Sequence, residues 1–334
     1  MPINNSLTKL SFWRSLVQWG FFGWILFLGI QFGLFVRHFE TAGATPLYVR
    51  PPGVEGFLPI GALASLKYWL TSGVFSNIHP AALVLFLTFL AMSLVAKKSF
   101  CSWLCPVGTL SELVWKIGQR LFGRTFRIWT WLDVLLRGAK YALLLFFIKI
   151  ILLDMPARAL GGFVNSPYWK LSDVKMLHFF TNISMTTLVI IGVLTALSLV
   201  YKNAWCRYLC PYGALLGLLS MASPLKVRRD TATCTDCQGC SRACPSLLPV
   251  HHKMTVRSPE CTGCVTCVEV CPERSLSMAL PVKPHSFPRW AFPVIALGIY
   301  AGGVALGMIT GHWHSSLTYA DYQHLIPMIN QLGM

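Results

Sequence analysis

Charged residues are scarce in this 334-residue sequence, and acidic residues are the scarcest. Asp and Glu together number 12, and all charged residues make up 12% of the chain, whereas 54% of the residues are hydrophobic. Such a composition argues against a water-soluble globular protein. It also excludes a disordered, collagen-like or coiled-coil chain, because each needs a polar, glycine-periodic or heptad-charged sequence. The motif CxxCH is absent as well, so the sequence does not indicate a covalently attached c-type haem.

No cysteine stands outside a patterned cluster. A secreted disulfide scaffold would be short and rich in loops, whereas these cysteines lie among long apolar segments. Ligation of metal in a reducing compartment is therefore the better interpretation. The clusters are Cys101 and Cys105; Cys206 and Cys210; Cys234, Cys237, Cys240 and Cys244; and Cys261, Cys264, Cys267 and Cys271.

Long apolar segments predict that the chain lies in a membrane. A helix needs about 20 apolar residues to cross the hydrocarbon layer, and five segments approach or exceed that length. A sixth apolar stretch, residues 57–70, is shorter and contains Pro59 and Lys67, so we expect an interfacial or re-entrant helix there. We predict a mainly α membrane protein with about five transmembrane helices, at residues 16–36, 80–97, 131–153, 177–200 and 290–311.

The 28 Lys and Arg residues would suggest nucleic acid binding in a soluble protein. Their placement favours membrane topology instead, since nineteen fall on one side of the predicted spans and six on the other. The basic side faces the cytoplasm, which places the N-terminus and all cysteines inside and the C-terminal tail outside. We expect membrane lipid as the partner and no nucleic acid. Arg137 and Lys140 lie within the third predicted span, near its inner end, and we expect them to extend to the interface.

An internal repeat contains four of the cysteines. Residues 100–110 (FCSWLCPVGTL) and 205–215 (WCRYLCPYGAL) share the pattern aromatic-CxxLCPxGxL. Proline after the second cysteine predicts a helix start, where the local positive potential favours a thiolate. Both copies would enter the membrane in the same direction. A pseudo-twofold axis along the membrane normal would then bring Cys101, Cys105, Cys206 and Cys210 together.

The role of these four thiols stays open at this point. They would bind an iron–sulfur cluster shared between the copies, which would be a third cluster beside the two assigned below. Alternatively, they would form a redox-active or structural thiol pair beside a quinone site. A transition-metal site is the third alternative, because soft thiolates suit Cu(I).

Residues 234–272 contain two runs of the form CxxCxxCxxxCP. This is the pattern of bacterial two-cluster ferredoxins, in which the fourth cysteine of each run ligates the other cluster. The short gaps force the backbone to curl, and we expect Gly239 and Gly263 to relieve the curl. Zinc would not need eight cysteines in this doubled spacing. We assign one 4Fe-4S cluster to Cys234, Cys237, Cys240 and Cys271, and the other to Cys261, Cys264, Cys267 and Cys244.

These motifs resemble those of a known family. Paired CxxxCP motifs followed by two CxxCxxCxxxCP runs are similar to the NapH-type iron–sulfur quinol dehydrogenase subunits of periplasmic nitrate reduction. They are also similar to the C-terminal half of NosR-type regulators, and residues 50–60 (RPPGVEGFLPI) resemble the NosR-type outer loop. The resemblance implies a multi-pass protein of the bacterial cytoplasmic membrane that exchanges electrons between the quinone pool and a partner redox protein or subunit. Membrane cupric reductases or assembly factors of the RdxA or CcoG type share the clusters and CxxxC pairs, and supply the alternative function.

Several other residues are candidates for the site. His79 and His178 precede the two repeats in corresponding positions, and a histidine can ligate haem or accept a proton from quinol. Trp103 and Trp205 lie beside the cysteines and are candidates to stack on a quinone. Basic residues in and around the ferredoxin-like insert would raise the cluster potentials, because they stabilise the more negative reduced form; they are Arg228, Arg229, Arg242 and Arg274.

The sequence predicts three domains. Residues 1–220 form a membrane domain with an outer loop and both CxxxCP repeats. Residues 221–288 form a cytoplasmic two-cluster ferredoxin-like insert, and residues 289–334 form the last transmembrane helix and an outward tail. Within that helix, Gly303, Gly307 and Gly311 recur every fourth residue and predict a close contact with a neighbouring helix.

Overall fold

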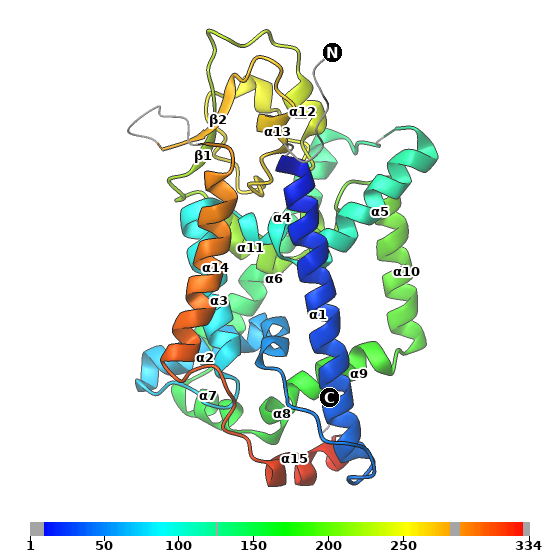
Figure 1. Ribbon diagram of the computed structural model, residues 1–334, viewed down its shortest axis with the longest axis vertical. Helices are drawn as coiled ribbons and strands as arrows, with labels where there is room; N and C mark the ends of the chain where they lie inside the picture. The colour runs from blue at the N-terminus through cyan, green and yellow to red at the C-terminus, as the bar shows by residue number, and fades with distance from the viewer. Residues whose placement is uncertain (1–9, 125, 281–287, 330–334) are drawn as a thin grey trace. The chain divides into compact units, whose positions relative to one another are not determined.

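The structure is a computed structural model that describes residues 10–124, 126–280 and 288–329 (Figure 1). Parts of the three predicted domains fall at residues 1–9, 125, 281–287 and 330–334, and these parts lie outside the described residues. The described chain is mainly helical, as the sequence predicts.

The chain divides into two compact units, which we describe separately. The cysteine unit contains all twelve cysteines and comprises Met1–Phe22, Phe89–Leu144 and Ile190–Tyr300. The second unit comprises Gly23–Thr88, Leu145–Val189 and Ala301–Met334. Five helices contribute residues to both units; they are α1 (Leu10–Glu40), α3 (Pro80–Ala96), α6 (Thr130–Ile148), α10 (Met185–Val200) and α14 (Ala291–Ile309).

Two helices are long and apolar enough to cross a membrane, namely α1 and α14. Helix α3 is apolar but has only 17 residues. Helices α9 (Ser172–Thr181) and α10 pass the same test only as a pair, because they are bent by 76° where they meet. The described residues thus contain two candidate spans, or three if the bent pair is one span, and the prediction of five spans is not confirmed.

The bend between α9 and α10 corrects one prediction. A single continuous helix over 177–200 is wrong, because α9 ends at Thr181 and a new helix starts at Met185. Ser184 lies just before that start, and its hydroxyl accepts a hydrogen bond from the backbone N–H of Thr187 at 3.2 Å. A serine that caps a helix in this way competes with continuation of the preceding helix.

Each CxxxCP repeat folds as two helical pieces in the cysteine unit. A short turn carries the first cysteine, the second cysteine is the N-cap, and proline occupies the first position of the next helix. Proline suits that position because its missing N–H would have no helical partner there. The predicted helix starts are confirmed. The pieces are α4 (Ser99–Trp103) and α5 (Pro106–Phe122) in the first copy, and η4 (Trp205–Leu209) and α11 (Pro211–Leu219) in the second.

A small antiparallel ribbon frames the ferredoxin-like insert. Strand β1 (Lys226–Arg229) precedes both cysteine runs and pairs with β2 (Leu276–Ala279), which follows them. Val227 of β1 lies opposite Met278 of β2, and both are buried. Between the strands lie only short helices: α12 (Gly239–Ala243), η5 (Val250–His252) and α13 (Thr266–Glu269).

The second unit is built from short helices around the aromatic face of α1. Phe32, Phe35 and Phe39 pack against Tyr322 and Ile326 near the C-terminus. Helix α2 covers the stretch predicted as an interfacial or re-entrant helix. The elements wholly in this unit are η2 (Pro52–Phe57), α2 (Pro59–Ser72), η3 (Lys149–Asp154), α7 (Ala157–Val164), α8 (Pro167–Lys170), α9, α15 (Tyr319–Leu325) and η6 (Ile326–Met328).

Two of the three glycines that the sequence assigns to a helix contact make that contact. A Cβ atom on Gly303 would lie 2.2 Å from the Thr88 hydroxyl of α3, and one on Gly307 would lie 2.8 Å from Val84. Gly311 has no neighbour of this kind; it adopts a φ of +75° just after α14 ends. Gly311 therefore terminates the helix rather than extending the contact.

Candidate functional site

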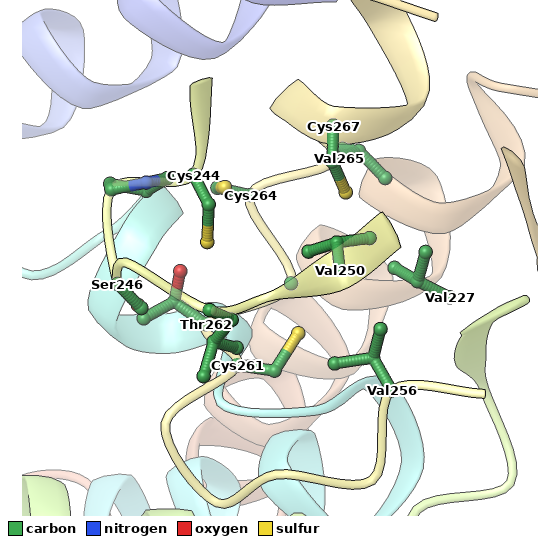
Figure 2. Close-up of a pocket in the computed structure, with 13 residues that line it drawn as sticks. Val227, Cys244, Ser246, Val250, Val256, Cys261, Thr262, Cys264, Val265 and Cys267 are labelled. Carbon is green, nitrogen blue, oxygen red and sulfur yellow. The ribbon is translucent and has the colours of Figure 1, made fainter. Parts of the chain in front are cut away.

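Four cysteines from both ferredoxin-like runs surround one small pocket. Figure 2 shows the side chains of Cys244, Cys261, Cys264 and Cys267 around it, with Val227, Val250 and Val256 completing the wall. Cys244 and Cys267 are each only 8% exposed. The structure therefore brings together the four ligands that the sequence assigns to the second cluster, including the exchanged Cys244.

The curl of each run depends on residues with positive φ. The two runs use the same two positions: Asp236 and Gln238 in the first, Gly263 and Val265 in the second. Glycine is required at Gly263, because a Cβ there would lie 2.7 Å from Phe292. The prediction for Gly239 is wrong, since Gly239 begins α12 with ordinary helical geometry and Gln238 makes the turn.

The electrostatics of the pocket suit a cluster with positively charged iron. Burial raises the pKa of Cys244 to about 12, with Cys264 adding to the rise. Burial and the neighbouring thiolates also raise the pKa of Cys267 well above its usual value. Such thiols lose their protons when a metal charge compensates them. Among the residues that the structure describes, no three His, Cys, Asp or Glu side chains lie close enough to bind one ion, whereas a cubane spreads its ligands further apart.

The other four cysteines of the insert are less enclosed. Cys237 is exposed, and Cys234, Cys240 and Cys271 are half-buried. Cys240 acts electrostatically on Cys267, which places the two runs close together. That Cys234, Cys237, Cys240 and Cys271 share one cluster stays a prediction of the spacing.

Two of the arginines singled out in the sequence lie against this first run. Arg229 lies 3.5 Å from the Cys234 sulfur, and Arg242 donates a hydrogen bond to the Cys237 carbonyl oxygen at 2.8 Å. Both positions fit the expectation that basic residues here stabilise a reduced cluster.

The four CxxxCP thiols converge, as the repeat predicts. Cys105 interacts electrostatically with Cys101, Cys206 and Cys210, and Cys206 does so with Cys101 and Cys210. In the second copy the N–H of Gly213 donates a hydrogen bond to the Cys210 sulfur at 3.2 Å. Each motif thus presents its second cysteine at a helix start.

Burial sets the chemistry of this thiol group. It raises the pKa of Cys101 to about 11 and that of Cys206 to about 12, and the pKa of Cys105 well above its usual range. The neighbouring thiolates add to each shift. A redox-active thiol pair needs a lowered pKa, because the thiolate is the nucleophile. The arrangement therefore favours ligation of a metal centre over thiol–disulfide chemistry.

Glycine in the motif permits this close packing. A Cβ on Gly108 would lie 2.3 Å from the carbonyl oxygen of Cys101, so helix α5 can begin there only with glycine. At the equivalent Gly213 the Cβ would lie 3.4 Å from the Cys210 sulfur, which is near ordinary contact. Both copies have glycine at this position, but only the first copy lacks room for a Cβ atom.

Both repeats form hydrogen bonds with the ferredoxin-like insert. The hydroxyl of Ser102 donates to the Thr262 carbonyl oxygen at 2.7 Å, and the Trp103 indole N–H donates to the Gly263 carbonyl oxygen at 3.2 Å. From the second repeat, Arg207 donates to the Ser246 carbonyl oxygen at 2.6 Å. Trp103 is 1% exposed and committed to this contact, so the expectation that it stacks on a quinone is wrong.

A buried ion pair ties α6 to the insert. The ammonium of Lys140 lies 2.6 and 2.7 Å from the two carboxylate oxygens of Glu260, and the Tyr141 hydroxyl donates to the same carboxylate at 3.2 Å. Lys140 is fully buried, so the prediction that it extends to the interface is wrong. Burial would raise the pKa of Glu260, but Lys98 and Lys140 hold it below its usual value.

The sequence reasoning missed three buried lysines that surround the sulfur ligands. Lys97, Lys98 and Lys202 are 0%, 4% and 6% exposed, whereas the sequence indicates only that they end the spans before the two repeats. One signal was available: Lys97 and Lys202 each precede the first cysteine of a repeat by the same number of residues.

The two candidate histidines have different surroundings in the second unit. His79 is 1% exposed; its Nε2 lies 2.8 Å from the Trp169 carbonyl oxygen and its Nδ1 3.3 Å from Glu55. Both of its ring nitrogens are thus occupied, and neither is free for haem or quinone. His178 lies in α9, where its Nε2 is 2.9 Å from a Glu40 carboxylate oxygen. The two histidines do not occupy equivalent positions, since His178 is separated from α10 by the bend.

Twelve cysteines in this arrangement, with helices apolar enough for a membrane, define a membrane-associated iron–sulfur protein that transfers electrons. Comparisons with known proteins agree. A family model described as a 4Fe-4S binding domain matches residues 78–125 and 183–230, which contain the two CxxxCP repeats. A second model, described as a 4Fe-4S dicluster domain, matches residues 226–272.

The relatives show the family. The putative electron transport protein YccM of Escherichia coli is 44% identical over 98% of this chain and 94% of its own length. The ferredoxin-type protein NapH of Haemophilus influenzae is 26% identical over 80% of this chain and 88% of its own length. The regulatory protein NosR of Pseudomonas aeruginosa is 27% identical over 54% of this chain but only 25% of its own length. The chain belongs to this NapH/NosR-type family of iron–sulfur electron-transport proteins. No solved structure matches it.

Proposed function

We propose that this protein is a quinol dehydrogenase-type subunit of the bacterial cytoplasmic membrane that passes electrons between the quinone pool and a partner redox protein. Residues 1–220 form its membrane domain, residues 221–288 its cytoplasmic cluster domain, and residues 289–334 a last span with an outward tail. The N-terminus faces the cytoplasm. The basic loops and the similarity to NapH support this reading.

The electron path in this proposal has three centres. Two 4Fe-4S clusters are held by the eight insert cysteines, and Cys101, Cys105, Cys206 and Cys210 hold a third centre. Convergence of those four thiols, the raised pKa values of Cys101, Cys105 and Cys206, and the family match over both repeats support ligation there. Iron–sulfur clusters accept one electron at a time, whereas quinol delivers two electrons and two protons. Several neighbouring one-electron centres can therefore accept the two electrons of one quinol.

The single observation that carries the proposal is the contact between the repeats and the insert. Ser102 follows Cys101 and binds the carbonyl oxygen of Thr262, which follows Cys261. Arg207 follows Cys206 and binds Ser246, two residues after Cys244. The cysteines proposed for the third centre thus lie on segments that are hydrogen-bonded to the segments carrying ligands of the second cluster. These side chains hold the two ligand sets in place for electron transfer.

The test is reduction of the clusters by quinol in anaerobically purified protein. We expect a quinol analogue to bleach the visible absorption of the wild-type protein. The double variant C105S/C210S should keep the insert clusters, reducible by dithionite, but lose most of the quinol-dependent rate. Oxidation of the reduced clusters by Cu(II), together with indifference to quinone analogues, would indicate a metal-ion reductase of the RdxA or CcoG type instead. Full cluster content without any reduction by quinol would contradict the proposal.

A further inference from the structure

The two repeats place an equivalent lysine beside opposite ligands of the same cluster site. Lys97 lies four residues before Cys101, and Lys202 lies four residues before Cys206. Lys97 interacts electrostatically with Cys261, and Lys202 with Cys244. Both cysteines line the pocket of Figure 2. Each repeat therefore contributes one ammonium group near this pocket.

Lys97 is a buried cation that forms no salt bridge with any carboxylate in the described part of the chain. Its side chain is fully enclosed, and its Nζ has no hydrogen-bond partner among the residues that the structure describes. Its backbone has a positive φ of 57°, and its Cβ packs against Gly263 in the cysteine loop. Burying an unpaired ammonium is costly unless an anion compensates it. A cluster with four thiolate ligands carries negative charge and would supply that anion.

Lys202 is held in a similar way on the other side. It is 6% exposed, and its Nζ lies 4.8 Å from the centre of the Trp115 ring, a cation–π contact. Burial lowers the pKa of Lys202, and the Cys244 thiolate opposes this shift. The nearby Lys98 differs from both lysines, because it acts electrostatically on the Glu260 carboxylate, which Lys140 binds directly.

We propose that Lys97 and Lys202 are paired redox-tuning residues that raise the reduction potential of the cluster ligated by Cys244, Cys261, Cys264 and Cys267. The inference rests on the proposed function, since it requires that cluster to be present. Reduction adds one electron, and hence one negative charge, to the cluster. Two buried ammonium groups, one beside Cys261 and one beside Cys244, stabilise the reduced form more than the oxidised form. The repeats thereby make this cluster the preferred electron acceptor next to the CxxxCP thiols.

The experiment is EPR-monitored redox titration of the full-length protein with chemical mediators, without quinol. The variants are K97M, K202M and the double variant, and methionine keeps the length of the side chain without its charge. We expect each single change to lower the equilibrium constant for reduction of this cluster about tenfold. This is equivalent to a fall of about 59 mV in the reduction potential of a one-electron couple. The double variant should fall further. The signal of the other cluster, identified by its loss in C237S, should move less.

Two controls make the outcome decisive. K253M removes an exposed lysine of the same insert and should shift neither cluster by more than about twofold, because solvent screens that charge. K97R and K202R retain the charge and should restore most of the potential. An unchanged potential in K97M and K202M at full iron content would overturn the inference, as would loss of this cluster alone. A failure of quinol oxidation would leave these potentials unaffected, so the two proposals fail separately.

Discussion

At the scale of single residues, buried charge distinguishes this protein from an ordinary bundle of apolar helices. Lys140 and Glu260 form an ion pair with side chains that are 0% and 7% exposed. Removing one member of such a pair leaves an uncompensated buried charge, which usually costs more than the pair itself contributes. The spacing of the cysteines gave no sign of this pair, because its members are 120 residues apart.

The variant K140M should therefore be strongly destabilised, by about 3 kcal/mol or more. Thermal unfolding in detergent measures the loss. The double variant K140M/E260Q should recover part of the loss, because the buried carboxylate charge is removed together with its ammonium partner. K149M is the matched control: Lys149 pairs with Asp154 in an exposed bridge, and its loss should cost less than about 1 kcal/mol. Equal losses in K140M and K149M would contradict the account of α6.

The glycines of the two CxxxCP motifs should respond differently to alanine. G108A pushes a Cβ to within 2.3 Å of a backbone oxygen that cannot move alone, so we expect loss of the metal centre at the repeat. G213A meets only a sulfur at 3.4 Å and should retain it. Iron content and visible absorption of the purified variants measure the effect. G138A on α6, where a Cβ meets nothing within 4 Å, is the control. A G213A variant more damaged than G108A would refute this packing.

The sequence predicts that Cys244, Cys261, Cys264 and Cys267 come together, but it does not predict which residues surround them. Eight cysteines in a doubled spacing specify a ligand set because the curl of the chain is local. The lysines around that set come from segments more than 30 residues away, and their basic character is equally consistent with topology. Only the fold shows that Lys97 and Lys202 face inward.

At the scale of elements, a polar network secures the loop before α2 in the second unit. Arg50 lies 2.6 Å from Asp173 of α9 and 2.8 Å from Glu55 of η2. Glu55 is fully buried and also accepts a hydrogen bond from the N–H of Ala82, in the first turn of α3, at 3.0 Å. One carboxylate thus joins three segments, and His79, directly before α3, also contacts it at 3.3 Å.

This network should make the stability of the protein depend on pH. Burial would lower the pKa of His79, but Glu55 and Asp173 raise it above its usual value of 6.5. A raised pKa in the folded state means that protonated His79 stabilises the fold fully below about pH 6.5. That contribution is lost as the pH rises through the higher folded value. Thermal unfolding at a series of pH values should show a loss in the wild type on the alkaline side that is absent from H79Q. An identical pH profile in both proteins would contradict the role of His79.

Element boundaries followed the sequence where proline specified them and departed where polar residues intervened. Pro106 and Pro211 begin helices as predicted, since proline has a local effect. The span over 177–200 is divided at Asn182 and Ser184, although hydropathy alone reads through them. A short polar interruption barely changes an averaged hydropathy, but it supplies a cap that starts a new helix.

At the scale of the whole molecule, the family and the electron-transfer role follow from motifs, whereas the number of spans does not. Among the helices that the structure describes, two satisfy the length and hydropathy of a membrane crossing, and others are short, bent or interrupted by charge. In α6 the charge comes from Asp133, Arg137 and Lys140. Arg207 pairs with Asp133 at 2.8 Å, so these residues serve contacts within the cysteine unit rather than the lipid. A count made on hydropathy alone cannot include such contacts.

The most direct test of the account is the iron and acid-labile sulfide content per chain of the anaerobically purified wild-type protein. Three cubanes would give about twelve iron and twelve sulfide atoms per chain. About eight iron and eight sulfide atoms per chain would mean that only the insert clusters are present and that the CxxxCP thiols bind no third cluster. A colourless protein that contains zinc in place of iron would contradict the claim that this chain carries electrons through iron–sulfur centres.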